Sequence, residues 1–370
     1  MKQELNSIAE APWVEPLMSW FYKNKRTMPW RQLSTPYRRW LSEIMLQQTR
    51  VETGIPYFHR FVERYPDIPS LAEAQEDDVL KLWEGLGYYS RARNLLKAAR
   101  FMVEHHGGNF PGTEKEAKAL PGVGPYTAAA VLSMAYGVPL PSVDGNVLRV
   151  YARLAALAEN VMDAATVKKV QQALEHVIPR ECPGDFNEAM MELGALVCLP
   201  ANPACDQCPV KPHCQAYATE QVDKLPLRIV KDRTTRHHYW VYYLLDSSGT
   251  NVAVKKNPPK GLLGGLWAFP MVECSGKTQS LPSMTEHEME EQARRDALKQ
   301  WQVALDQVKH KGGKTHVFSH RHWTMEVFRG IIKDPTLPEG CGWVGVDSLK
   351  DLAFPEVYQK VIRLMEDRPD

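Results

Sequence analysis

Residues 120–131 read Leu-Pro-Gly-Val-Gly-Pro-Tyr-Thr-Ala-Ala-Ala-Val, and this stretch decides the fold of the first half of the chain. Proline has no backbone N–H and glycine is conformationally permissive, so Pro121 to Gly124 cannot continue a helix. The flanking residues, 115–120 and 126–136, are typical of helices. The sequence therefore predicts a helix, a tight Gly-rich hairpin and a second helix. Such a hairpin presents backbone N–H groups that can bind a phosphate without any side chain.

The surroundings of this stretch distinguish it from an ordinary helix–helix turn, which would be the simpler interpretation if it stood alone. A Gly/Pro-rich loop follows the second helix and leads to Asp144. The sequence here resembles the helix-hairpin-helix DNA glycosylases, whose pattern is L-P-G-x-G followed by a Gly/Pro loop and a catalytic Asp. The resemblance implies that the hairpin backbone at Gly122, Val123 and Gly124 binds the DNA backbone.

The composition limits the class of protein. The chain has 370 residues, enough for two ordinary domains, and its 44% hydrophobic and 24% charged content is typical of soluble globular proteins. The net charge is +1 and the half with the hairpin is slightly acidic, so any DNA contact must come from local geometry. No apolar run approaches the ~20 residues that span a bilayer, and residues 1–10 are too polar for a signal peptide. We expect a cytoplasmic, nucleoid-associated protein with reduced thiols.

The sequence pattern changes near residue 225, which indicates more than one domain. In residues 1–217 apolar side chains recur at spacings of three and four, predicting an all-α domain of roughly ten helices. Residues 218–235 lack that pattern and carry several basic side chains. We predict that they form a linker, which either lies along a phosphate backbone or is merely solvated.

Residues 236–370 predict a small α+β domain, because they combine β-rich segments with two helical ones. The expected strands are at 238–245, 251–254, 266–269 and 324–328, and the expected helices are at 286–301 and 355–366. The expected fold class is therefore multi-domain, with a helical domain followed by an α+β domain.

Four cysteines are spaced as ligands of a metal centre, in the order Cys198-x6-Cys205-x2-Cys208-x5-Cys214. Four thiolates can give one ligand to each iron of a cubane cluster. Zinc also accepts four thiolates, but its ribbons usually have two C-x-x-C pairs and only one occurs here. The pattern favours a [4Fe–4S] cluster, with zinc or unligated core cysteines as alternatives. The spacing matches the endonuclease III and adenine glycosylase families, in which such a cluster closes the helical domain. Because residues 199–204 contain no Lys or Arg, the cluster is expected to be structural.

Two carboxyl groups have contrasting surroundings in the sequence. Glu43 lies among apolar neighbours in a helical segment, where desolvation would raise its pKa and let it act as a general acid. Asp144 precedes a helix, whose terminal N–H groups would favour the ionised carboxylate. Glycosidic cleavage uses such a pair, one group to protonate the leaving group and one to face the cationic sugar. By residue type alone, Glu43 is more often a surface helix residue and Asp144 more often a turn or helix-cap residue.

Three further segments resemble the MutY family of adenine DNA glycosylases, and the match extends over nearly the whole chain. The family segment L-x-E-(I/V)-M-L-Q-Q-T stands here as LSEIMLQQT at residues 41–49. The family segment W-E-G-L-G-Y-Y-x-R-A-R-N-L stands as WEGLGYYSRARNL at residues 83–95, and MPWR at residues 28–31 also matches. These matches are long and specific.

The resemblance implies roles for particular residues. Glu43 would protonate N7 of a flipped adenine, and Asp144 would stabilise the oxocarbenium ion. The two carboxylates would be supported by Tyr126 and Asn146. The adenine pocket would be lined by Trp30, Arg31, Leu46 and Glu188. The residues that wedge into the duplex would be Gln48 and Tyr88, with Thr49 and Leu86 beside the opposite 8-oxoguanine. Flipping costs a few kcal/mol of unstacking, which wedging side chains can offset.

Tyr126 also bears on the reaction type. Relatives that cut the strand as well place a Lys at this hairpin position to form a Schiff base, which tyrosine cannot form. We therefore predict a monofunctional glycosylase, a hydrolase of the N-glycosyl bond that leaves an abasic site. The alternative is a bifunctional, endonuclease III-like glycosylase/lyase that acts on oxidised pyrimidines. A Nudix hydrolase and a non-catalytic iron–sulfur damage sensor are more distant alternatives.

The C-terminal part resembles a Nudix (MutT-like) fold, on the basis of GGLWAFP at residues 264–270 and the helix through residues 295–301. Active Nudix enzymes hold Mg²⁺ with paired glutamates on that helix; here Lys299 and Gln300 replace them, so no nucleotide hydrolysis is expected. In the MutY family this domain recognises 8-oxoguanine through a Phe-Ser-His loop, which alone could also be a strand end with a capping Ser. The loop stands here as Phe318, Ser319 and His320. The expected partner is double-stranded DNA with A·8-oxoguanine or A·G mispairs, bound by a monomer.

Overall fold

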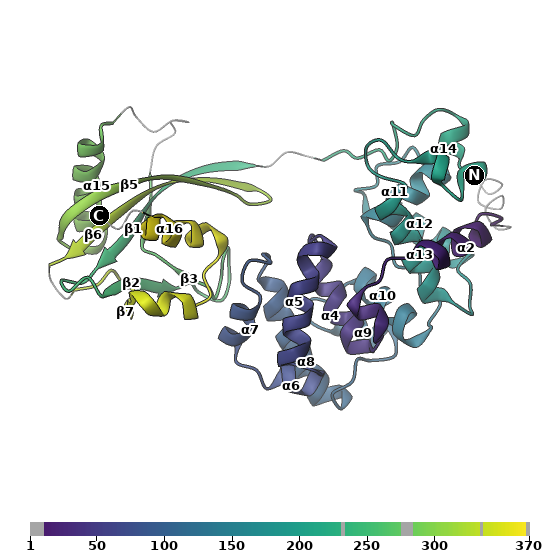
Figure 1. Cartoon of the computed structure of the whole chain (residues 1–370), viewed down its shortest axis with the longest axis horizontal. Helices are drawn as coiled ribbons and strands as arrows, with labels where there is room; N and C mark the ends of the chain where they lie inside the picture. The colour runs from purple at the N-terminus through teal and green to yellow at the C-terminus, as the bar shows by residue number, and fades with distance from the viewer. Residues whose placement is uncertain (1–10, 231–233, 275–283, 334–335, 368–370) are drawn as a thin grey trace. The chain divides into compact units, whose positions relative to one another are not determined.

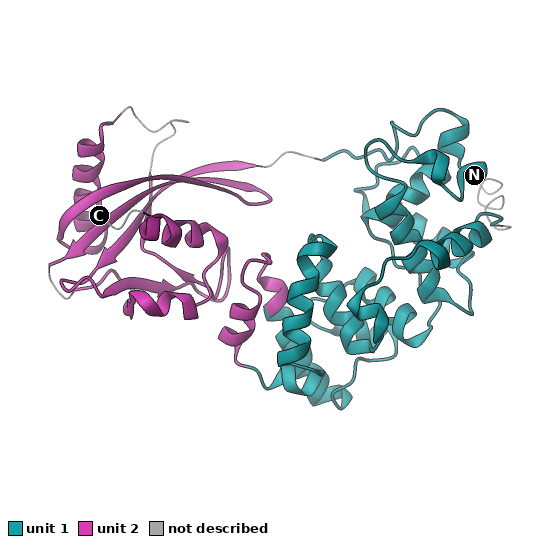
Figure 2. Ribbon diagram, in the orientation of Figure 1, with its two compact units in different colours: residues 1–74, 93–231 teal, residues 75–92, 232–370 magenta. Residues whose placement is uncertain are grey.

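Helices form the first part of the chain and strands the last, as the change in sequence pattern predicts (Figure 1). The computed structural model describes residues 11–230, 234–274, 284–333 and 336–367, so that residues 231–233 of the predicted linker lie outside it. The chain divides into two compact units (Figure 2). The first comprises residues 1–74 and 93–231, and the second comprises residues 75–92 and 232–370.

The first unit is helical throughout its described residues. Its α-helices are α2 (Val14–Asn24), α3 (Pro29–Gln32), α4 (Pro36–Leu46), α5 (Val51–Arg64), α6 (Ile68–Ala72), α8 (Ser90–His106, from residue 93), α9 (Glu114–Ala119), α10 (Pro125–Tyr136), α11 (Gly145–Leu154), α12 (Ala164–Glu175), α13 (Pro183–Leu196) and α14 (Gln215–Ala218). Two 3₁₀ turns, η1 (Cys205–Gln207) and η2 (Lys211–His213), precede α14. The helical class predicted for this half is confirmed.

Helix α4 is buried on almost all of its faces. It begins after Thr35, whose side chain accepts a hydrogen bond from the backbone N–H of Arg38, and Pro36 takes the first helical position. Its buried residues include Trp40, which is fully inaccessible, and the polar residue Glu43. A helix that is surrounded by protein on all sides carries its polar side chains into the interior, where each one needs a partner.

The predicted helix-hairpin-helix is formed by α9 and α10. Helix α9 ends at Ala119, and the carbonyl of its C-cap residue, Leu120, accepts a hydrogen bond from the N–H of Val123 at 3.1 Å. Gly124 caps the start of α10, and proline occupies the next position. Gly122 has φ of +76°, and a Cβ there would lie 2.7 Å from Cβ of Asn94. The hairpin therefore requires glycine at residue 122, both for its backbone conformation and for the close approach of α8.

The loop from α10 to α11 is held in place by Asn187 on α13. The side-chain amide of Asn187 donates to Oγ of Ser133 and to the carbonyl of Leu140, both at 2.8 Å. Its carbonyl oxygen accepts from the N–H of Ser142 at 3.0 Å. Asn187 is 2% exposed, so these bonds lie in the interior. They fix the segment that leads directly to Asp144, the N-cap residue of α11.

The second unit contains one seven-stranded mixed sheet with the order β3-β2-β1-β6-β5, in which β4 also pairs with β1 and β7 with β2. The strands are β1 (Thr235–Leu245), β2 (Asn251–Lys256), β3 (Trp267–Ala268), β4 (Met271–Glu273), β5 (Leu305–Val317), β6 (Arg321–Ile332) and β7 (Cys341–Gly345). Strands β1 and β6 are parallel, and the other pairs are antiparallel. The short helix η3 (Val346–Asp351) follows β7.

Both faces of this sheet are covered, because successive residues of a strand point to opposite faces. Tyr239 and Val241 of β1 belong to a core that includes residues of α16 (Glu356–Asp367). Trp240 and Tyr242 belong to another core, which includes residues of α15 (Glu286–Trp301). The result is a helix–sheet–helix sandwich, so the predicted α+β class with its two helices is confirmed.

Strand β5 was absent from the sequence-based prediction. It contains Gly312 and Gly313 and several charged residues, and its pairing with β6 shifts register between Asp306 and Lys309 and again between His310 and Gly312. Each register shift reverses which residues face the core, so the alternation that marks a strand in a sequence is interrupted.

The second unit also includes residues 75–92, with helix α7 (Glu76–Leu82). Oε1 of Glu84 accepts hydrogen bonds from the N–H of Phe354 at 2.9 Å and from Nε2 of Gln359 at 2.8 Å. Nζ of Lys81 donates to the carbonyl of Leu352 at 3.0 Å. This segment thus bonds to the region around the start of α16. The domain limits read from the sequence, with a helical domain ending at residue 217, stay a prediction.

Among the residues that the structure describes, none of the helices has the length and apolar composition needed to cross a membrane.

Replacing Gly122 by alanine tests the conformational requirement of the hairpin. We expect Gly122→Ala to lower the free energy of unfolding by about 1–3 kcal/mol, because alanine is strained at positive φ and its Cβ would overlap Asn94. The matched control is Gly124→Ala, since Gly124 has φ of −87° and open space around it. Chemical denaturation of both variants measures the difference, and equal stabilities would contradict this account of the hairpin.

Candidate active site

One cavity of the first unit collects most of the residues singled out in the sequence. It has a volume of about 330 Å³, within the size range of small-molecule sites. Its walls come from α3, α4, the segment after α4, α10, the start of α11, and α13. The predicted site residues among them are Trp30, Arg31, Glu43, Leu46, Gln48, Thr49, Tyr126, Asp144, Asn146 and Glu188.

Glu43 reaches this cavity from α4 and is 8% exposed. Burial raises the pKa of Glu43 from 4.5 to about 7, and the negative charges of Asp144 and Glu188 act in the same direction. The hydroxyl of Tyr126 donates to Oε2 of Glu43 at 2.6 Å and opposes this rise, as does the positive charge of Arg39. Burial also raises the pKa of Tyr126 well above its usual value, so that Tyr126 is a neutral donor. At neutral pH the Glu43 carboxyl therefore exists in both protonated and ionised forms.

Asp144 lies at the N-terminus of α11, where its Oδ1 accepts from the N–H of Val147 at 2.7 Å and its Oδ2 accepts from Nδ2 of Asn146 at 2.9 Å. These bonds lower the pKa of Asp144, as expected for a helix N-terminus. Burial nevertheless outweighs them and raises the pKa above its usual value. The N–H groups at the helix N-terminus therefore favour the ionised carboxylate, as the sequence predicts, but the effect of burial is larger.

Asn146 is held by residues that the sequence did not indicate. Nη2 of Arg149 donates to Oδ1 of Asn146 at 2.9 Å, and Nε of Arg149 donates to the carbonyl of Cys198 at 2.8 Å. Gly194 on α13 lies so close that a Cβ there would be 2.7 Å from Cβ of Asn146. The orientation of Asn146 toward Asp144 thus depends on α13 and on Cys198, two residues beyond its end. An Arg in a helical stretch gives no signal for such a role, because two of the groups that hold it, the carbonyls of Gly194 and Cys198, lie 45 and 49 residues away.

A chain of alternating charges lies at the floor of the cavity and directly behind it. Oε1 of Glu188 accepts from Nε of Arg31 at 2.8 Å and from Nη1 of Arg39 at 2.6 Å. Glu192, one turn further along α13, accepts from Nη2 of Arg31 at 3.2 Å and from Nε of Arg26 at 2.8 Å. The sequence indicated Arg31 and Glu188 but missed the other three. Glutamates spaced by four in an otherwise apolar helix were the one signal that could have found Glu192.

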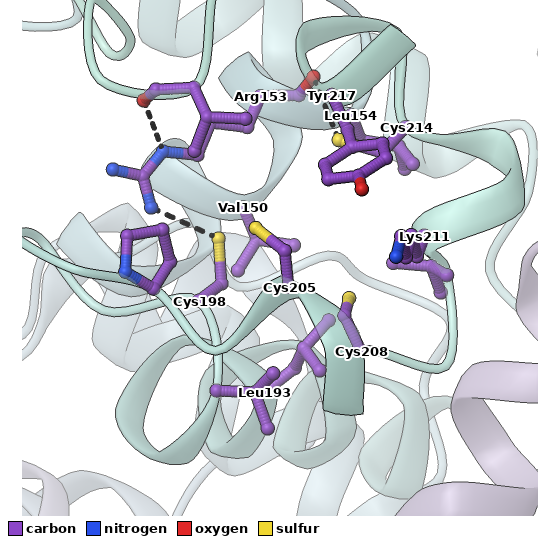
Figure 3. Close-up of a pocket in the computed structure, with 14 residues that line it drawn as sticks. Val150, Arg153, Leu154, Leu193, Cys198, Cys205, Cys208, Lys211, Cys214 and Tyr217 are labelled. Carbon is purple, nitrogen blue, oxygen red and sulfur yellow. Dashed lines mark hydrogen bonds between the residues drawn. The ribbon is translucent and has the colours of Figure 1, made fainter. Parts of the chain in front are cut away.

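The four predicted ligand cysteines surround a common pocket (Figure 3). They are Cys198, Cys205, Cys208 and Cys214, and apolar side chains such as Val150 and Leu193 form part of the wall. Burial raises the pKa of the Cys208 thiol to about 11, and the charges of the other three sulfurs add to this effect. Nη1 of Arg153 lies 3.4 Å from Sγ of Cys198. Across the described ranges, no three His, Cys, Asp or Glu side chains are placed to hold a single metal ion.

Two further predicted residues, Leu86 and Tyr88, lie in the second unit, in the loop after α7. Tyr88 is 47% exposed and has φ of +47°, and the guanidinium of Arg91 lies 5.6 Å from its ring centre. Leu86 is buried. In the first unit, Gln48 also has a positive φ, of +58°. Non-glycine residues with positive φ are strained, and such strain is common at functional sites.

The predicted reader loop is the turn between β5 and β6. The N–H of Phe318 donates to the carbonyl of Arg321 at 2.7 Å, which closes the turn. The Phe318 ring packs edge-on against Trp323, with ring centres 4.9 Å apart. Ser319 and His320 are exposed at the tip, and Oγ of Ser319 lies 3.2 Å from Nδ1 of His320. An anchored aromatic ring thus supports two accessible polar side chains.

The hairpin residues Gly122, Val123 and Gly124 lie between α9 and α10, separate from the walls of the cavity. Gly122 and Gly124 are accessible, whereas the side chain of Val123 is buried. The cavity and the hairpin are connected through α10, since Tyr126 follows the hairpin directly. A phosphate bound at the hairpin would therefore lie one turn or less from the residue that bonds to Glu43.

Two protein families match the chain. Residues 41–180 match the family described as HhH-GPD superfamily base excision DNA repair protein, and residues 240–364 match the NUDIX domain family. The two matches fall on the helical hairpin with its cavity and on the sheet with its two helices.

Relatives of the chain cover nearly all of it. The adenine DNA glycosylase of Mus musculus is 33% identical over 95% of this chain and 77% of its own length. The adenine DNA glycosylase of Buchnera aphidicola subsp. Schizaphis graminum is 30% identical over 95% of this chain and 97% of its own length.

Solved structures resemble the helical part. The structure of a thermostable thymine-DNA glycosylase is 27% identical, covers 58% of this chain and 98% of its own, and superposes with a TM-score of 0.53. A trapped endonuclease III–DNA covalent intermediate is 24% identical, covers 60% of this chain and 98% of its own, and has a TM-score of 0.50, which shows a shared fold.

Removing the hydroxyl of Tyr126 tests its effect on Glu43. We expect the pKa of Glu43 to rise above about 7 in Tyr126→Phe, because a hydrogen bond to a carboxylate stabilises the charged form. The pKa is measured by NMR titration of protein labelled at its glutamate carboxyls. Tyr136→Phe is the control, since its hydroxyl bonds to the carbonyl of Phe110 at the other end of α10. An unchanged or lower pKa in Tyr126→Phe would contradict the assignment.

Proposed function

The chain belongs to the adenine DNA glycosylases, and from this premise we propose that it excises adenine paired with 8-oxoguanine or guanine and leaves an abasic site without cutting the strand. It removes adenine from DNA by hydrolysis of the N-glycosyl bond, in base-excision repair. The observation that carries the proposal is the cavity in which Glu43, bonded to Tyr126, lies together with Asp144.

Glu43 is the proton donor in the proposed mechanism. The bond between sugar and base breaks more readily when the base is protonated, because the neutral adenine is a better leaving group than its anion. A carboxyl with a pKa of about 7 is a protonated donor in a large fraction of molecules at neutral pH. Tyr126 binds Oε2 of Glu43, which leaves Oε1 to carry the proton toward N7 of adenine.

Asp144 stabilises the positive charge that develops on the sugar. Burial disfavours its ionised form, while the bonds from Val147 and Asn146 favour it. A cation beside this carboxylate relieves the cost of the buried charge, and that relief is greatest in the transition state. Bonds to Val147 and Asn146 fix both oxygens, so the carboxylate is already oriented before the sugar becomes cationic.

Two features favour release of the base without strand cleavage. The hairpin position that would need a Schiff-base lysine holds Tyr126, whose hydroxyl is engaged by Glu43. In addition, the described residues that line the cavity include arginines but no lysine. A lyase reaction through an amine of this cavity therefore lacks its nucleophile.

The base itself is recognised by the charged floor and one aromatic wall. Adenine presents an amino donor at N6 and ring nitrogens as acceptors. Glu188 offers only acceptor atoms and Arg31 only donors, and they are fixed by their bond to each other. Trp30 is 5% exposed and packs edge-on against Phe58, which holds its ring rigidly at the cavity. Leu46 completes the apolar surface.

The base paired with the adenine is recognised by residues outside the charged floor of the cavity. We propose Gln48 and Tyr88 as wedges in the duplex, supported by the strained backbone of both. Thr49 and Leu86 then lie beside the opposite base. The accessible polar atoms of Ser319 and His320 read 8-oxoguanine, which differs from guanine in its carbonyl at C8 and its donor at N7.

The four cysteines fit a [4Fe–4S] cluster better than a single zinc ion. They share one pocket, but no three of them are placed to hold one metal ion, whereas a cubane keeps its four thiolates further apart. Cys198, Cys205, Cys208 and Cys214 would hold the cluster, which supplies a structural cross-link of this region. Most of the remaining wall is apolar, Lys211 and Tyr217 also line it, and Arg153 donates to Sγ of Cys198.

A single-turnover assay tests the proposed reaction. Duplexes carrying A opposite 8-oxoguanine, A opposite G, or an oxidised pyrimidine are incubated with excess protein, and products are separated with and without alkali. We expect strand breaks only after alkali, about tenfold faster opposite 8-oxoguanine than opposite G. Glu43→Gln should slow release by about 10²- to 10⁴-fold while still binding the duplex. Breaks without alkali on the pyrimidine lesion would overturn the proposal in favour of a glycosylase/lyase.

The same assay distinguishes recognition of the base opposite adenine from cleavage of the N-glycosyl bond. Ser319→Ala removes a polar group at the tip of the β5–β6 turn and leaves the cavity untouched. It should reduce the preference for 8-oxoguanine over guanine more than it slows release opposite guanine. Equal losses on both duplexes would show that Ser319 does not read the lesion.

Metal analysis tests the cluster. Protein purified without oxygen should contain about four iron and four sulfide per chain, and Cys208→Ser should lower both. Cys274→Ser is the control, since Cys274 lies at the end of β4, outside the group of four. One zinc per chain, or iron that is unchanged in Cys208→Ser, would contradict this proposal.

A further inference from the structure

Arg39 is a buried arginine that the sequence did not indicate as functional. It lies on α4, one helical turn before Glu43, and is 6% exposed. Its Nη1 donates to Oε1 of Glu188 at 2.6 Å, and its Nε donates to Oγ of Ser34 at 2.8 Å. Arg39 is not among the described residues that line the cavity. It therefore approaches Glu188 from behind, on the side away from a bound base.

The contacts of Glu188 are asymmetric. Arg39 and Arg31 both donate to Oε1, and within the described ranges no protein group donates to Oε2. Glu188 lines the cavity. Two guanidinium groups on one oxygen hold the carboxylate in a fixed orientation with its negative charge satisfied on one side. The other oxygen is then left as an acceptor for the amino group of adenine.

Charged and titratable side chains face Glu43 from each of the elements around it. Besides Arg39 on its own helix, the groups that face it are Tyr126 on α10, Asp144 at the start of α11, Glu188 and Glu192 on α13, and Arg31 and Arg26 from the segment around α3. Four carboxyl groups, those of Glu43, Asp144, Glu188 and Glu192, share the cavity, but only one has to carry the proton for catalysis. Arg39 distinguishes between them, because it bonds directly to Glu188 and acts on Glu43 only through space.

We propose that Arg39 is a positioning residue that orients Glu188, presents Oε2 of Glu188 to the bound adenine and places a positive charge near the proton donor Glu43. The inference rests on the proposed roles of Glu43 and Glu188. A positive charge disfavours a proton on a neighbouring carboxyl group. Arg39 therefore sets how acidic the proton donor is, and its loss leaves Glu188 with Arg31 as its one remaining cation.

The first test needs no DNA. The pKa of Glu43 is measured by NMR titration of glutamate-labelled protein in the wild type, Arg39→Met, Arg39→Lys and Arg38→Met. We expect the pKa to rise in Arg39→Met and to stay near the wild-type value in Arg39→Lys, which retains the charge. Arg38→Met is the matched control, because it removes the same charge from the preceding residue of α4, which is more accessible than Arg39. No rise in Arg39→Met, or an equal rise in Arg38→Met, would overturn the proposal.

The second test measures the pH dependence of single-turnover adenine release opposite 8-oxoguanine. In Arg39→Met the alkaline limb of the pH–rate profile, where the rate of adenine release falls as the pH rises, should move to higher pH. The plateau rate should fall about tenfold, because Glu188 loses a charged hydrogen bond. Arg39→Lys should restore the limb. A merely structural role would lower the rate without moving the limb, and that result overturns the proposal.

A double-mutant cycle separates action through Glu188 from general destabilisation. If Arg39 acts by orienting Glu188, Arg39→Met should have little further effect on the plateau rate in a Glu188→Gln background. Full additivity would contradict the inference even if Arg39→Met folds poorly. Failure of the mispair assay by the wild type would refute the proposed function instead, and the titration would still decide whether Arg39 governs Glu43.

Discussion

The close approach of α13 to α10 and α11 is the constraint on which the site depends. A Cβ on Gly184 would lie 2.7 Å from Cα of Met134, and a Cβ on Gly194 would lie 2.7 Å from Cβ of Asn146. Only glycine permits such contact at both ends of the helix. Between these two contacts, α13 is held against the start of α11, and its inward side chains have fixed places. The geometry of the candidate site therefore depends first on how closely the backbones of these helices pack, because this packing sets where the side chains lie.

This packing places polar groups in the interior, and the buried polar side chains Asn187, Glu188 and Glu192 of α13 each have hydrogen-bond partners there. Asn187 makes three hydrogen bonds that fix the loop before Asp144, and Glu188 and Glu192 bind arginines from the segment around α3 and from α4. An unpaired buried charge costs several kcal/mol, so removal of one partner is strongly destabilising. The same bonds therefore determine both the stability of the unit and the shape of the cavity.

Features that depend on a residue's own backbone or its immediate neighbours could be predicted from the sequence. Features that depend on contacts with residues far along the chain could not. The hairpin was predictable, because proline and glycine act on their own backbone, whereas residue type alone favoured a surface position for Glu43, which is buried. Arg39 follows another arginine in a helix and looks like a solvated residue, yet its partner lies 149 residues away. Strand β5 escaped because two register shifts break its alternation. The rise in the pKa of Asp144 likewise has no local signal, since it comes from burial in the folded unit.

The carboxyl groups of the site divide into two kinds according to their partners. Glu188 and Glu192 each form ion pairs with arginine, whereas no arginine or lysine within the described ranges forms an ion pair with Glu43 or Asp144. Since the pKa of Glu43 rises from 4.5 unfolded to about 7 folded, the folded state loses about 3 kcal/mol of stability as the pH rises through that range. That cost remains above neutral pH, and an arginine placed against Glu43 would remove it. It would also remove the proton that the proposed reaction requires, so the absence of an ion pair at Glu43 is a condition of the proposed mechanism.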